Sequence, residues 1–144
     1  MKVPIDGGPP QPVSSQVAYA PAFSLDGKLL AFVTVEGAGA NVQTFRTVIP
    51  SNGGAPLYKI PAPLNGALAV IRFTPDGQAL SYVVTEGGVG NLWAQPLSGG
   101  QPKQLTDFKS DLIFDWGWSR DGKQLALTRG QVSHDVVLLT DTGK

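Results

Sequence analysis

Short apolar runs separated by turn residues make up most of the chain. In its middle, Val, Ile, Leu, Thr and aromatic residues predict four successive strands, at 68–74, 80–85, 91–97 and 103–106. Gly, Pro, Asn and Asp fill the intervals, as turns require. No window of about a dozen residues combines helical apolar spacing with freedom from Gly and Pro. The pattern therefore predicts an all-β fold.

The strand pattern recurs along the chain. Asp-Gly pairs occur at intervals of 50 and 45 residues, at Asp26-Gly27, Asp76-Gly77 and Asp121-Gly122. Each pair follows an aromatic residue, a hydroxyl residue and one variable residue, and precedes an apolar–small–apolar triplet. Gly-Gly-x-Pro sequences recur every 46 residues, beginning at Gly7, Gly53 and Gly99. Markers that share one period indicate a repeat protein.

Four strands in a repeat of this length are typical of a β-propeller blade. We expect a partial β-propeller of four-stranded antiparallel blades, about three blades' worth and an arc of a larger propeller. Residues 1–15 align with the end of a preceding blade, 16–61 and 62–107 with two blades, and 108–144 with an incomplete C-terminal blade. An arc leaves two blade faces uncovered, so we expect the rest of a parent chain or self-association to cover them. Alternatively, residues 1–5 complete the last blade.

The Asp-Gly pairs predict the turn between the first two strands of each blade. In the middle repeat, Pro75 presets φ, Asp76 can bond to nearby backbone, and Gly77 accepts the left-handed conformation. The other repeats place Leu25 and Arg120 at the proline position. These Asp-Gly pairs are expected to serve as structural turns.

Composition narrows the classes of function. Eleven basic and 11 acidic residues give zero net charge without a basic run, so no nucleic-acid partner is expected. The absence of cysteine excludes disulfides, a thiol nucleophile and a cysteine zinc site. No apolar stretch approaches the length of a membrane span, so this segment is not expected to insert into a membrane. With 42% hydrophobic and only 15% charged residues, the chain is expected to fold.

Two short matches to nucleotide-binding sequences coincide with repeat turns. Residues 97–101, Leu-Ser-Gly-Gly-Gln, match the signature peptide of ATP-binding-cassette ATPases, but no Walker A sequence accompanies them. Residues 37–39 and 88–90, both Gly-x-Gly, lack the third glycine and the helix of a dinucleotide site. No cofactor is therefore expected.

Catalytic and metal sites are also not expected. His134 is the single histidine, and no Gly-x-Ser-x-Gly sequence supplies a nucleophile. Asp107, Asp111 and Asp115 are spaced four residues apart but lack the pattern of a calcium loop. We therefore expect a protein that is not an enzyme.

Aromatic residues near the last Asp-Gly pair are the candidates for partner binding. Trp116 and Trp118 share strand parity and are expected to point to one side. Aromatic residues of this kind usually pack between blades, and this is the role expected for Phe23, Phe73 and Trp118. Alternatively, one of the two tryptophans could anchor a peptide at the end or axis of the propeller. Trp116, Trp118 and His134 are thus possible binding residues for a protein or peptide partner. The remaining charges are expected to be solvated at loops and rims, at Glu36, Glu86, Arg46, Lys59, Arg72 and Arg129.

The repeat resembles that of TolB-like propellers, a bacterial WD-repeat-like class. The residues that carry this resemblance are 73–77, 80–82, 91–93 and 105–106. Residues 116–127 with 133–139 are similar to the end of the sensor propeller of certain bacterial serine/threonine protein kinases.

This resemblance implies a non-catalytic protein- or ligand-binding module, the C-terminal sensor or scaffold of a larger bacterial signalling protein. It favours an extracytoplasmic or periplasmic location. Two alternatives remain: the substrate-gating propeller of a prolyl-oligopeptidase-like hydrolase, and a TolB-like periplasmic envelope protein. The sequence does not identify the ligand, because propeller binding surfaces lie on variable loops.

Overall fold

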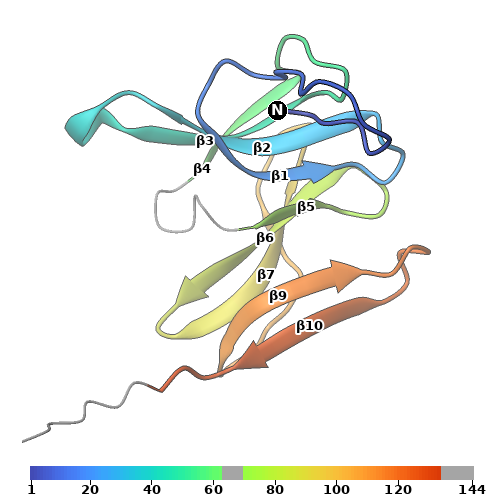
Figure 1. Cartoon of the computed structure of the whole chain (residues 1–144). Coiled ribbons are helices and arrows are strands. Elements are labelled where there is room, and N and C mark those ends of the chain that lie inside the picture. Colours follow the sequence, from blue (N-terminus) through green and yellow to red (C-terminus); the bar gives the residue numbers. More distant parts are fainter. Residues whose placement is uncertain (63–69, 134–144) are drawn as a thin grey trace, which may run out of the picture.

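The computed structural model describes residues 1–62 and 70–133. In this part of the chain, three antiparallel sheets follow one another like leaves of a fan (Figure 1). The first sheet has the order β1 (Ala18–Phe23), β2 (Leu29–Glu36), β3 (Gln43–Pro50), β4 (Tyr58–Ala62). The second has the order β5 (Ile71–Phe73), β6 (Ala79–Glu86), β7 (Val89–Pro96), β8 (Lys103–Gln104). β9 (Leu112–Trp118) pairs with β10 (Leu125–Gly130), and a 3₁₀ turn, η1, covers Gly39–Asn41.

The second sheet contains the four strands predicted for the middle repeat, with different ends. β5 occupies only part of the range 68–74, of which 68 and 69 lie outside the described residues. β8 is shorter than predicted because Thr106 interrupts the ladder. Its hydroxyl accepts the backbone N–H of Leu92 at 2.9 Å, in place of a backbone carbonyl.

Apolar residues on alternate faces of the strands hold the sheets together. On β2, Ala31 and Val33 face the second sheet and pack in one cluster with Phe73, Leu80 and Tyr82. The opposite face of the second sheet packs on the third through a cluster of Leu92, Ile113 and Trp116. Burial on both faces of a sheet is the packing expected between blades. The predicted all-β partial propeller is therefore confirmed.

Residues 1–17 lie against the outward face of the first sheet. Val13 packs on a small cluster formed by Leu30, Phe32 and Ile49. The backbones of Lys2 and Gln11 pair through two hydrogen bonds of 2.8 Å. The alternative in which residues 1–5 complete the last blade is therefore wrong. Figure 1 shows the N-terminus at the opposite end of the fan from β10, because the apolar outward face of the first sheet binds this segment.

Candidate binding groove at the inner strands

A groove of about 370 Å³ crosses the inner strands of all three sheets. We call it the inner groove. Each repeat contributes the end of its first strand, β1, β5 or β9, and the beginning of the turn that follows. Equivalent positions of the three repeats thus meet in one concavity, as expected for strands nearest a propeller axis. The equivalent pairs are Phe23 with Leu25, Phe73 with Pro75, and Trp118 with Arg120.

Internal hydrogen bonds hold the turns at the rim of the groove. In the second sheet, the Thr74 hydroxyl donates to Asp76 Oδ1 at 2.6 Å, and the backbone N–H of Gln78 donates to the same oxygen at 3.0 Å. Gly77 has a φ of 68°, in the left-handed region. The first and third turns repeat these bonds, through Ser24 with Asp26 and Ser119 with Asp121.

These hydrogen bonds also stabilise the ionised form of the turn carboxylates. The Thr74 hydroxyl and then the Gln78 backbone N–H hold the pKa of Asp76 below its usual value. Ser24 lowers the pKa of Asp26 in the same way, and Ser119 that of Asp121. Because these carboxylates are occupied by donors of their own turns, the turns act as rigid supports for the groove.

The second and third turns touch each other. A Cβ atom added to Gly122 would lie 2.6 Å from Pro75 Cβ, which is closer than two carbon atoms can approach. The absence of a side chain at Gly122 therefore allows the two turns to meet. This contact brings Pro75 and the start of the third turn together at one side of the inner groove.

Two arginines are the charged residues among the described lining of the groove, Arg72 on β5 and Arg120 in the third turn. Arg72 Nη2 donates to Asp115 Oδ1 on β9 at 2.6 Å, which links the second and third sheets. The Trp116 backbone N–H, and then Arg72, hold the pKa of Asp115 below its usual value. Arg72 Nε is buried and has no hydrogen-bond partner among the described residues. The groove is thus mostly apolar, with one arginine, Arg72, paired with an aspartate and the other, Arg120, in no salt bridge within the described residues.

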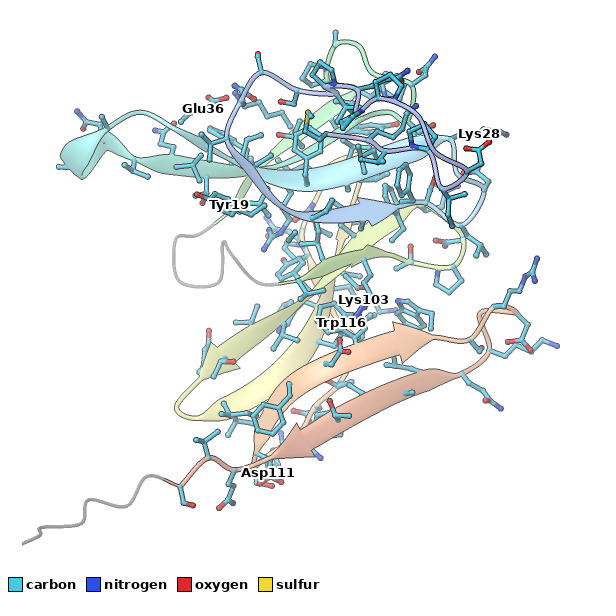
Figure 2. The ribbon with its side chains drawn as sticks, viewed as in Figure 1. Tyr19, Lys28, Glu36, Lys103, Asp111 and Trp116 are labelled. Atoms are coloured by element: carbon cyan, nitrogen blue, oxygen red, sulfur yellow. The ribbon has the colours of Figure 1, made fainter. Side chains whose placement is uncertain are left out.

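The residues predicted to bind a partner differ in their access to solvent. Trp116, a residue of β9, is only 5% exposed because its side chain lies against the second sheet (Figure 2). Trp118 is half-buried and lines the inner groove. Both indole nitrogens donate to Ser81 Oγ, so they point to one side as predicted. His134 lies outside the described residues. Partner binding by these residues stays a prediction, for which Trp118 has the most suitable position.

Four residues of the groove were not predicted from the sequence as binding residues, namely Phe23, Leu25, Arg72 and Arg120. The expectation that Phe23 packs between blades stays a prediction, because this residue is 55% exposed and also lines a depression on the outward face of the first sheet, which no other sheet covers among the described residues. Phe73, at the equivalent position, is buried between the first two sheets as expected. The signal that could have identified the groove is the alignment of Leu25 and Arg120 with Pro75, since equivalent positions of a propeller face one axis.

The predicted solvation of the scattered basic residues is wrong for Arg46. This residue of β3 is only 4% exposed, and its guanidinium carbon lies 3.6 Å from the centroid of the Tyr82 ring. Burial lowers the pKa of Arg46. At the third sheet, the Arg129 guanidinium stacks at 3.5 Å on Phe108. Long basic side chains are accepted between blades because an aromatic face stabilises the buried charge.

The aspartates at 107, 111 and 115 each form a salt bridge with a lysine or an arginine. Asp107 contacts Lys109 at 2.6 Å and Asp111 contacts Arg129 at 3.9 Å, while Asp115 pairs with Arg72. Across the described ranges 1–62 and 70–133, no group of His, Cys, Asp and Glu side chains has the arrangement of a metal site.

The nucleotide-like sequence at 97–101 forms the turn between β7 and β8, where Gly99 and Gly100 have positive φ.

No protein-family model matches the chain. Tricorn protease homolog 1 of Streptomyces coelicolor is 38% identical over 63 residues, which are 43% of this chain and 6% of that protein. The crystal structure of TolB from Acinetobacter baumannii matches 76% of this chain with a TM-score of 0.53 and 28% identity. Acylaminoacyl peptidase of Pyrococcus horikoshii matches 89% with a TM-score of 0.56 and 15% identity, a likeness of fold alone.

The chain spans 26% of the TolB chain and 20% of the peptidase chain. These matches support the propeller-like fold and the TolB-like character of the repeat. In the described ranges, no helix has the length and hydropathy needed to cross a lipid bilayer.

Proposed function

We propose that the chain is a non-catalytic binding module whose inner groove receives a segment of a protein partner. The supporting observation is the convergence of three repeats on one concavity with exposed apolar side chains, among them Phe23, Leu25 and Val70. A concave, mostly apolar site with a few polar groups is the usual form of a binding site, and exposed aromatic residues are frequent anchors of protein partners.

The proposal that the module is non-catalytic rests on the state of its hydroxyl groups. Thr74 and Ser119 line the inner groove, but each hydroxyl donates to a turn carboxylate and accepts a backbone N–H. These two hydroxyl groups therefore stabilise their own turns.

Selection of peptides from a displayed random library would test this proposal. Leu25 is 63% exposed and lines the groove, whereas Leu57 is 53% exposed and lies outside it, which makes the two residues a matched pair. We expect peptides selected on the native chain to lose about fivefold or more in affinity for Leu25→Ser and to keep their affinity for Leu57→Ser. Equal affinity for the native chain and Leu25→Ser would contradict binding in the groove.

We propose further that the module belongs to a larger bacterial signalling protein with a serine/threonine kinase. Support for this parent is the similarity of residues 116–127 to the end of kinase sensor propellers. The coding sequence around residues 1–144 tests it directly. Kinase motifs upstream would support the proposal, and a parent gene without a kinase domain would contradict it.

Two other parents have support from the comparisons. The likeness to Tricorn protease homolog 1 favours the propeller of a peptidase. A Gly-x-Ser-x-Gly domain downstream would identify such a hydrolase. The match to TolB favours an envelope protein, which a signal peptide directly before the first blade would support.

The outward face of the first sheet is a second place for a partner. A depression of about 690 Å³ lies there, lined by exposed apolar residues that include Met1, Ile5 and Tyr19. We propose that the rest of a parent chain, or a second copy of this one, covers this face. Light scattering on the purified chain separates the two, since a well-dispersed monomer of 15.1 kDa would contradict self-association.

A further inference from the structure

We propose that the inner groove selects a peptide segment in which an aspartate or glutamate lies beside a bulky apolar residue. This inference rests on the proposed binding function and adds the chemistry of the partner. Its basis is the placement of Arg72 and Arg120 around an otherwise apolar concavity.

Arg120 supplies positive charge that the described residues leave available. It is exposed, and it makes no salt bridge or side-chain hydrogen bond within the described ranges. The carboxylate of its own turn, Asp121, accepts from the Ser119 hydroxyl at 2.5 Å and from the Lys123 backbone N–H at 3.1 Å. Arg120 can therefore form an ion pair with an incoming carboxylate at small cost in desolvation.

Arg72 adds a second donor deeper in the groove. Its Nη2 is bonded to Asp115, and this is the one salt bridge of the side chain among the described residues. A guanidinium has five N–H donors, so further donors remain for a ligand. Because Asp115 already compensates the charge of Arg72, Arg120 would supply the ion pair to a ligand carboxylate, and Arg72 would add hydrogen bonds from its remaining N–H groups.

The apolar wall determines the neighbour of this carboxylate. Phe23 and Leu25 are exposed on the side of the first sheet, and Val70 is exposed beside β5. Burial of a leucine or aromatic side chain against them removes apolar surface from water on both partners. The segment should therefore carry its acidic residue next to a bulky apolar one.

The turn carboxylates exclude a nucleic acid as the occupant. Asp26, Asp76 and Asp121 follow the lining residues directly in the three turns at the groove rim. A phosphate backbone would bring many negative charges close to them, whereas its binding requires a surplus of basic residues. A peptide with one carboxylate meets much less of this repulsion than a chain of phosphates does.

Titration of the isotopically labelled chain with three blocked peptides would test the inference. The probes are acetyl-Leu-Glu-Leu-amide and its Gln and Lys counterparts, followed through the Trp118 indole N–H and the Arg120 backbone N–H. We expect the Glu peptide to bind about threefold more tightly than the Gln peptide, and the Lys peptide most weakly. The difference should shrink as the salt concentration rises.

Arg120→Gln and Lys123→Gln form the matched pair, because both remove one positive charge from the same turn and only Arg120 lines the groove. Arg120→Gln should abolish the preference for Glu over Gln, and Lys123→Gln should preserve it. Equal binding of the Glu and Gln peptides at the groove would overturn the acidic preference and leave the binding function standing. Absence of groove shifts with all three peptides at millimolar concentration would contradict both.

Discussion

The Trp116 indole N–H donates a hydrogen bond of 3.2 Å to Ser81 Oγ across the boundary between the second and third sheets. Ser81 is completely buried, and its hydroxyl also donates to the Arg72 carbonyl at 3.0 Å. Trp118 Nε1 donates to the same oxygen at 3.4 Å. The other repeats have Ala31 and Ala126 at this position. One serine therefore satisfies both tryptophans that join these sheets.

Ser81→Ala should destabilise the chain by about 1–3 kcal/mol, because it leaves the buried Trp116 N–H without an acceptor. Urea unfolding followed by tryptophan fluorescence measures the loss. Ser98→Ala is the control, since Ser98 is exposed in the turn between β7 and β8. Equal midpoints for the two variants would show that the hydrogen bonds at Ser81 contribute no net stability.

Arg46→Lys should cost about 1–2 kcal/mol, although it preserves the charge. The planar guanidinium stacks on Tyr82, whereas an ammonium group is more strongly hydrated and loses more on burial. Arg120→Lys, at an exposed site, should change the free energy of unfolding by less than about 0.5 kcal/mol. If Arg46→Lys left the free energy of unfolding unchanged, the Tyr82 ring would not distinguish a guanidinium from an ammonium group.

Gly77→Ala should destabilise the chain by about 1–2 kcal/mol through strain at positive φ. No heavy atom lies within 4 Å of the added Cβ, so the backbone conformation alone is tested. Gly117→Ala is matched to it, because its added Cβ also meets open space and its φ is outside the left-handed region. Thermal unfolding should show a lower midpoint only for Gly77→Ala, and an unchanged midpoint there would contradict the turn assignment.

Gly122→Ala should cost more than Gly77→Ala. Its φ of 69° gives the same strain, and its added Cβ also collides with Pro75. A double-mutant cycle with Pro75→Gly isolates the collision, because the cost of the flexible glycine cancels in the cycle. We expect the loss at Gly122 to fall towards that of Gly77→Ala in the Pro75→Gly background. Strictly additive losses would show that the two turns do not touch.

Acid should weaken the fold through the three turn carboxylates. Their pKa values are lowered from the ordinary 3.8 by turn hydroxyls and backbone N–H groups. A lowered folded-state pKa gives stability that is present above the unfolded-state pKa and is lost as the pH falls through the folded-state pKa. The free energy of unfolding should therefore decline below about pH 4.

Replacing Asp26, Asp76 and Asp121 together by Asn checks this expectation. Asn can accept the same turn hydrogen bonds but does not titrate. The triple variant should lose less stability than the native chain between pH 5 and pH 2, measured by urea unfolding at each pH. Parallel curves for the two proteins would place the acid sensitivity in other carboxylates, such as Glu36 with its Lys59 partner.

The repeat period and the strands were predictable from the sequence because both depend on neighbours along the chain. Apolar alternation around Leu80 and Leu92 predicts strands, and the Asp-Gly pairs predict where they reverse. The ends of β8 were less predictable, since Thr106 reaches back to Leu92 and replaces a rung of the ladder. The all-β class and the propeller architecture thus followed from local patterns and their repetition.

Only the tertiary structure decided which side of each repeat is buried. Phe23 and Phe73 are equivalent in sequence, yet Phe73 is covered by a neighbouring sheet and Phe23 is exposed. Arg46 looks like a surface charge until Tyr82 of the next sheet is placed over it. The inner groove likewise needs residues about 45 positions apart to meet at one axis. Such contacts depend on stacking between sheets, which no local pattern encodes.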